Sequence, residues 1–275
     1  RGTWAGINDI PDADLWAHHN RAKTQMLALV RERLAIQLME VHAAPAEVNA
    51  GARALDPRAL TIGFARRFAT YKRATLLFQD QERLKRLLNN LDRPVQLIFS
   101  GKAHPADEPG KAFIQAIYQM SRKPGFAGKI VFVEDYDANI ARHLVSGVDV
   151  WLNNPRRPLE ASGTSGQKAG CHGCLNCSIL DGWWREGYDG TNGFAIGSDA
   201  HPESVEEQDR LDSENLYRVL TTEVIPTFYD RDANGIPRNW IAKIRRAMVT
   251  LVPQFNTWRM VQEYTKQYYV PESKR

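Results

Sequence analysis

The residues best suited to chemistry lie in a few short stretches, and the first is a run of four cations within residues 66–73. Arg66, Arg67, Lys72 and Arg73 fall within eight positions. Arginine offers a fork of donors and lysine a point charge, so together they could hold a dianion such as a phosphate group. An ordinary solvated basic turn is the alternative interpretation, and spacing alone favours it.

A second stretch, residues 160–168, is a loop of small residues that begins with Glu160 and ends on Lys168. Backbone N–H groups in such a loop can point at anionic or hydroxyl groups. It is not a phosphate-binding loop of the Walker type, because Ala169 follows the lysine where Ser or Thr is required. Lys168 could carry Schiff-base chemistry, and Glu160 could bind sugar hydroxyls. A surface lysine and a helix-start carboxylate are the alternatives.

Two further stretches leave their interpretation open. Residues 100–105 include Lys102 and His104, which could face the same crevice or could belong to a turn that begins a helix. Trp183 and Trp184 are adjacent in a glycine-rich loop. They could stack on a sugar or anchor that loop in the core.

The three cysteines all fall within seven residues, at Cys171, Cys174 and Cys177, next to His172. Such a set could bind zinc or an iron–sulfur cluster. However, the ligands would lie within one turn and strand, so we expect small buried residues and no metal. An odd number of clustered cysteines argues against a disulfide framework and indicates a reducing compartment, so we expect a cytoplasmic protein.

The elements that position these stretches alternate between strand and helix. Apolar runs predict strands at 60–64, 95–99, 130–133, 148–152 and 175–180, with helices at 74–90, 110–122 and 137–146. This order predicts βαβ units and a Rossmann-like parallel sheet of the α/β class. Ligands in such sheets lie at the carboxyl ends of the strands, where residues 64–73, 100–107, 134–137 and 153–170 are expected.

We divide the chain into three parts. Residues 1–56 are a helical segment and linker, with a helix at 12–42 and a break at 43–57; residues 57–200 form the cofactor- and phosphate-binding domain. Residues 201–275 form a helical segment, with helices at 203–226, 238–252 and 255–266. The net charge of +4 over 275 residues is too mild to indicate nucleic acid. No apolar run reaches the roughly 18 residues of a membrane span, so no membrane partner is expected.

At these motifs the chain resembles the C-terminal part of an α-glucan phosphorylase, acting on glycogen, starch or maltodextrin, of the shorter bacterial and archaeal branch. The matching segments, in the family's order, are residues 66–73, 101–105, 134–137, 149–155, 160–168 and 180–184. The resemblance implies the C-terminal lobe of a glycosyltransferase-B fold. The chain begins with Arg, and we expect a missing N-terminal lobe of the same protein, so that this chain alone binds cofactor and phosphate weakly without turning over glucan.

The resemblance also implies an activity and a cofactor, pyridoxal 5′-phosphate on Lys168. The cofactor phosphate would relay a proton to and from inorganic phosphate, which would cleave a terminal α-1,4-linked glucose of the glucan as glucose 1-phosphate with retention. By motif position, Arg67 would hold the substrate phosphate with Arg66 beside it. Lys72 would lie by the cofactor phosphate and bridge the two.

The remaining implied roles concern the cofactor and the sugar. Thr164 and the amide of Ser165 would help to hold the cofactor phosphate, and Tyr136 would lie beside the cofactor. Glu160, Ser162 and Gly163 would bind hydroxyls of the transferred glucose.

The chain departs from the family's pattern in four ways, one of which is the segment 169–174, where the family usually has apolar residues followed by Asn and Gly. Gln167 stands where Met is usual, His172 stands where Asn is expected, and Asp137 follows Tyr136 where other branches carry Arg. A nucleotide-sugar-dependent glycosyltransferase of the same fold is the alternative enzyme, since it also needs cations near a diphosphate. A non-catalytic carbohydrate- or metal-binding protein is a third hypothesis.

Overall fold

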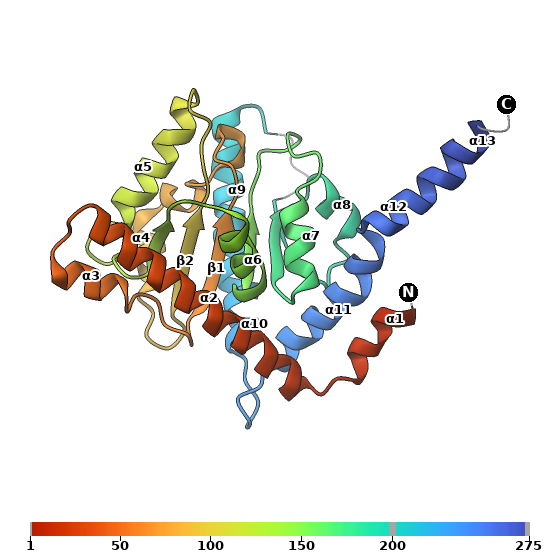
Figure 1. Cartoon of the computed structure of the whole chain (residues 1–275), viewed down its shortest axis with the longest axis horizontal. Coiled ribbons are helices and arrows are strands. Elements are labelled where there is room, and N and C mark those ends of the chain that lie inside the picture. Colours follow the sequence, from red (N-terminus) through yellow and green to blue (C-terminus); the bar gives the residue numbers. More distant parts are fainter. Residues whose placement is uncertain (1, 198–201, 273–275) are drawn as a thin grey trace.

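A six-stranded parallel sheet organises the protein (Figure 1). The computed structural model describes residues 2–197 and 202–272. The strands follow the order β3-β2-β1-β4-β5-β6, and every neighbouring pair is parallel. The strands are β1 (Leu60–Ala65), β2 (Val95–Ser100), β3 (Ile130–Val133), β4 (Val150–Asn153), β5 (Leu175–Ile179) and β6 (Phe194–Ile196).

The α/β class and the five expected strands are therefore confirmed, each within two residues of its predicted bounds. β6 was missed because three residues carry too little pattern to be recognised. The expected boundary between residues 200 and 201 lies outside the described residues.

Helices cover both faces of the sheet, and alternate strand residues serve the two cores. Leu97 and Phe99 join one core while Ile98 joins the other, as the two-residue period of a strand requires. Apolar residues of α2 (Asp12–Glu40), α6 (Ala138–Gly147) and α7 (Thr164–Cys171) belong to the second core. The first core includes residues of α4 (Gln81–Leu88), α5 (Glu108–Arg122), α9 (Val205–Val219) and α11 (Arg238–Gln254).

Several sequence expectations were wrong in detail. The stretch 160–168, expected as a loop, is helical from Thr164 on, and the two adjacent tryptophans begin a short helix, α8 (Trp183–Gly187). The break at 43–57 contains α3 (Pro45–Gly51), because a proline at the first turn begins a helix as readily as it ends one. The helix expected at 74–90 is a 3₁₀ turn, η3 (Leu76–Gln79), followed by α4. Asp80 starts α4 by accepting a hydrogen bond from the Arg83 N–H.

The remaining elements lie at the two ends of the chain, directly after β5 and directly after α9. They are α1 (Gly2–Ala5), η1 (Gly6–Asp9), α8 (Trp183–Gly187), η4 (Leu220–Val224), α10 (Ile225–Tyr229), α12 (Thr257–Tyr264), η5 (Thr265–Tyr269) and α13 (Val270–Glu272). In Figure 1, α12 and α13 extend away from the sheet. Among the described residues, none of the helices combines the length and apolar character needed to span a membrane.

A buried ionic cluster fastens α2 to the amino ends of β1 and β4. The Asp149 carboxylate, which is fully buried, lies 2.6 Å from Lys23 Nζ and 2.8 Å from His19 Nε2, and it accepts a hydrogen bond from the Thr61 N–H. Lys23 Nζ also donates to the Ala59 carbonyl. Burial alone would raise the pKa of Asp149, but Lys23 and His19 outweigh it and hold that pKa below its ordinary value.

We predict that Lys23→Met lowers the free energy of unfolding by about 3–5 kcal/mol, because it leaves a buried carboxylate without its main counter-charge. Urea denaturation measures the change. Lys111→Met is the matched control, since Lys111 pairs with Glu108 on the exposed surface at 2.7 Å, and it should cost less than about 1 kcal/mol. Equal effects of the two variants would contradict an essential role for the buried cluster.

Candidate active site

The site lies at the carboxyl ends of β1 and β4, the two neighbouring strands between which the strand order reverses. From β1 the chain moves outward to β2 and β3, then returns to β4 on the other side of β1. A crevice at the carboxyl ends of such a pair is the usual binding place in open α/β sheets. Arg66 follows β1 directly, Asn153 ends β4, and Glu160 lies in the loop after β4.

Arg66 joins these two strand ends. Its Nη2 donates to Glu160 Oε1 at 2.7 Å, and its Nη1 donates to Asn153 Oδ1. Arg66 and Glu160 are both buried. The guanidinium is therefore fixed in direction rather than free to sample solvent, which overturns the solvated-turn interpretation for this residue. Sequence reasoning assigned no role to Asn153, although its place at the end of an apolar strand was a usable signal.

The end of β2 and the loop after it hold the backbone of the basic stretch in place. The Arg66 N–H donates to the Ser100 carbonyl at 3.2 Å, and the Phe68 N–H donates to the Lys102 carbonyl at 2.9 Å. Gly101 has φ of +149°, and a side chain there would collide with the Arg66 carbonyl. His104 Nδ1 accepts from the Ala106 N–H, so its ring closes a local turn, as the simpler interpretation of this stretch predicts.

Lys72, at the end of η2 (Thr70–Lys72), completes the charged cluster. Its Nζ lies 3.9 Å from Glu160 Oε2 and is buried. Burial, together with the positive charges of Arg66 and Arg67, lowers the pKa of Lys72 to about 8, although Glu160 opposes this change. Arg66 and Lys72 thus share the single carboxylate of Glu160, with the charge of Arg67 nearby, and this surplus of positive charge suits a dianion.

Two buried atoms of this cluster have no hydrogen-bond partner among the described residues: Glu160 Oε2 and Arg66 Nε. Buried polar atoms are nearly always hydrogen-bonded in folded proteins. These two are therefore available to a polar ligand, as an acceptor and a donor respectively.

The helix α7 begins beside Glu160. Gly163 caps it with φ of +92°, a conformation that suits glycine, and a Cβ there would lie 3.4 Å from Glu160 Oε1. The first N–H groups of a helix have no partner inside it, and the helix dipole adds positive charge there, so this end can bind an anion. Thr164 and Ser165 form this first turn, and Trp151 Nε1 donates to Ser165 Oγ at 3.2 Å.

The other predicted site residues lie around this core at different depths. Arg67, Ser162, Thr164 and Lys168 are exposed. Lys168 stands one turn into α7, and no hydrogen bond joins its side chain to another described residue. Burial raises the pKa of Tyr136 while the charge of Arg66 opposes the rise, which places this phenol within electrostatic reach of the cluster.

The tryptophans and cysteines serve the core instead. Trp183 and Trp184 are buried, and the Trp183 ring contacts Gly166 of α7 and Phe255. This supports the anchoring interpretation over sugar stacking. Cys174 and Cys177 are buried while Cys171 is exposed. In the part of the chain that the structure describes, His, Cys, Asp and Glu side chains form no group of three that could hold a metal ion.

Comparison with known proteins gives a consistent result. The chain matches the family profile described as carbohydrate phosphorylase over residues 19–264. It is 47% identical over 268 residues to the maltodextrin phosphorylase of Thermococcus litoralis, covering 98% of this chain and 31% of that protein. It is 47% identical over 269 residues to the glycogen phosphorylase of Aquifex aeolicus, covering 98% and 38%. The chain thus spans only about a third of the length of these relatives.

The low pKa of Lys72 gives a pH prediction. We expect the affinity of this chain for inorganic phosphate to fall as the pH rises through about 8, because Lys72 then loses the proton that gives it charge. The fall should reach up to about tenfold per pH unit, the limit for one titrating group. Isothermal titration at pH 6.5 to 9.5 measures it. In Lys72→Arg the charge persists and the fall should disappear; the same fall in both proteins would assign it to another group.

Proposed function

Because this chain belongs to the carbohydrate phosphorylase family, we propose that it is the cofactor- and phosphate-binding part of an α-glucan phosphorylase. The reaction is phosphorolysis of a terminal α-1,4-linked glucose by inorganic phosphate to give glucose 1-phosphate. The observation that carries this proposal is the buried cluster of Arg66, Lys72 and Glu160 at the carboxyl ends of β1 and β4.

The residues present fit pyridoxal 5′-phosphate. The first turn of α7, with Thr164 and Ser165, offers N–H groups to a phosphate. The Lys72 amine offers a positive charge, and a nearby anion would raise its lowered pKa back toward the ordinary value. Lys168 follows on the same helix with an exposed amine that can bond to an aldehyde. When bound, the cofactor supplies a phosphate with a second pKa near 6, which can give and take a proton at neutral pH.

The cations of the chain solve the main electrostatic problem of this reaction. Two like charges about 4 Å apart repel by roughly 4 kcal/mol at an effective dielectric constant of 20, so two phosphates cannot approach without neutralisation. Arg66 is held rigidly by Asn153 and Glu160. Arg67 is exposed and can close on an incoming phosphate. In this proposal, Lys72 would bridge the substrate phosphate and the cofactor phosphate.

We assign sugar binding to the residues between β4 and α7, which include Glu160, Ser162 and Gly163. Glu160 uses Oε1 for Arg66, and its Oε2 has no hydrogen-bond partner among the described residues, which makes that oxygen an acceptor for a glucose hydroxyl. Ser162 offers an exposed hydroxyl, and Gly163 offers its backbone amide. The three free cysteines also suit a reducing compartment, and we place the protein in the cytoplasm.

We predict that the chain takes up pyridoxal 5′-phosphate and that borohydride fixes it to Lys168. Absorbance follows uptake, and mass spectrometry of the reduced protein locates the label. Lys168→Ala should lose retention of the cofactor, whereas Lys111→Ala, at an exposed lysine of α5, should keep it. A colourless protein that instead binds a nucleotide sugar would replace this proposal with the glycosyltransferase alternative.

The isolated chain should bind phosphate but release no glucose 1-phosphate from a maltodextrin, because we assign the remaining part of the site to the portion of the relatives that this chain does not match. A coupled assay for glucose 1-phosphate measures this. Sustained release by the isolated chain would contradict a site divided between two lobes.

A further inference from the structure

Arg73, the last cation of the basic stretch, has no place in the proposed chemistry. We propose that it is a positioning residue, which clamps the loop that carries Lys72 against the loop that carries Glu160 and fixes both to α9. The identity of the bound anion rests on the proposed function, but the clamp itself is a property of the contacts of Arg73.

The Arg73 guanidinium is only 3% exposed and uses its three nitrogens on four neighbours. Its Nε donates to the Asn154 carbonyl at 2.9 Å, and its Nη2 donates to the Pro155 carbonyl at 2.8 Å. Its Nη1 lies 2.9 Å from Asp209 Oδ1 and 2.8 Å from Asp212 Oδ2, both on α9. A forked side chain is required to reach two backbone carbonyls and two carboxylates at once.

The two loops are also joined through their backbones on either side of Lys72. Asn154 Nδ2 donates to the Arg73 carbonyl at 2.9 Å, and the Arg156 N–H donates to the Tyr71 carbonyl at 2.6 Å. Lys72 lies between these two attachment points, and Glu160 lies four residues beyond Arg156. The 3.9 Å separation of Lys72 Nζ and Glu160 Oε2 therefore depends on this junction.

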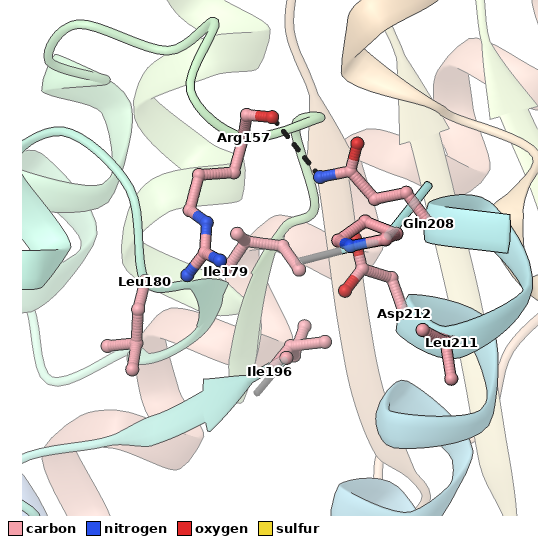
Figure 2. A pocket seen from close by; sticks show the side chains of 9 residues that line it. Arg157, Ile179, Leu180, Ile196, Gln208, Leu211 and Asp212 are labelled. Atoms are coloured by element: carbon pink, nitrogen blue, oxygen red, sulfur yellow. Dashed lines mark hydrogen bonds between the residues drawn. The ribbon is translucent and has the colours of Figure 1, made fainter. Parts of the chain in front are cut away.

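Further side chains of α9 hold the loop that carries Glu160. Arg156 Nη2 lies 2.6 Å from Asp209 Oδ2, so Asp209 serves both loops. Figure 2 shows the next contact along, where Gln208 Nε2 donates to the Arg157 carbonyl at 3.1 Å. The helix α9 thus contacts both loops and sets their position relative to each other.

The backbone of Arg73 supports a role for its side chain. Its φ of +49° lies in the left-handed region, which glycine adopts freely and arginine does not. Local conformation would favour glycine at this position. The presence of arginine is explained by the four contacts that only its side chain provides.

This backbone gives a discriminating pair of variants, Arg73→Gly and Arg73→Lys. Arg73→Gly relieves the backbone and removes the clamp, while Arg73→Lys keeps the charge and removes the fork. The matched control is Arg83→Lys, since Arg83 Nη1 also reaches α9, at Glu214, but ties down α4 and not the site. Asp209→Asn weakens the clamp at the α9 side and leaves the amino-acid sequence of both loops unchanged.

The first measurement is the rate at which acetic anhydride modifies Lys72, read by peptide mass spectrometry in the chain without cofactor. We expect both Arg73 variants to raise this rate at least about tenfold and Asp209→Asn to raise it less, with Arg83→Lys unchanged. The second is the dissociation constant for pyridoxal 5′-phosphate, which should rise about tenfold in the Arg73 variants. Urea denaturation verifies that each variant is folded.

The outcomes separate the clamp from the proposed function. If the chain without substitutions takes up no pyridoxal 5′-phosphate, the proposed function fails. The rate at which acetic anhydride modifies Lys72 still decides the role of Arg73. If acetic anhydride modifies Lys72 in the folded Arg73→Lys and Arg73→Gly variants at the same rate as in the chain without substitutions, Arg73 is a structural residue only. The proposal is then overturned.

Discussion

Repulsion between like charges is the constraint on which the carboxyl end of this sheet depends. Arg66, Arg67 and Lys72 stay close together even without an anion, and the charges of the two arginines add to burial in lowering the pKa of Lys72. Glu160 is the one carboxylate that touches both Arg66 and Lys72 among the described residues. The strand ends, the start of α7 and the Arg73 junction can all be understood as the framework that resists this repulsion.

The two ends of the sheet illustrate opposite solutions to a buried charge. At the amino end, Asp149 has both oxygens hydrogen-bonded and is matched by Lys23 and His19. At the carboxyl end, Glu160 Oε2 and Arg66 Nε have no hydrogen-bond partner among the described residues, and the cations of the cluster outnumber its one carboxylate. The first arrangement favours stability, whereas the second reserves polar atoms and charge for a ligand. Such an imbalance is typical of functional sites.

Sequence patterns predicted the architecture well, because apolar runs separated by helical periods depend on local order along the chain. They also placed the basic stretch and the Glu160 loop at the same edge of the sheet. They gave no role to Asn153 and grouped Arg73 with the cations that could hold an anion, since the partners of Arg73 lie 81 and 136 positions away. Contacts across such separations follow from the packing of α9, which no local spacing encodes. The Pro45 helix and the short β6 were missed because few residues define them.

The ionic cluster at the amino end has a consequence for biosynthesis. Lys23 lies in α2 but its carboxylate, Asp149, follows 126 residues later. At roughly 5–20 residues per second, a ribosome needs about 6–25 seconds to cover that interval. Throughout this time α2 carries a lysine and a histidine within its apolar stripe that water must solvate. The helix can therefore dock on the nascent sheet only after β4 begins to emerge, which makes this region a late step in co-translational folding.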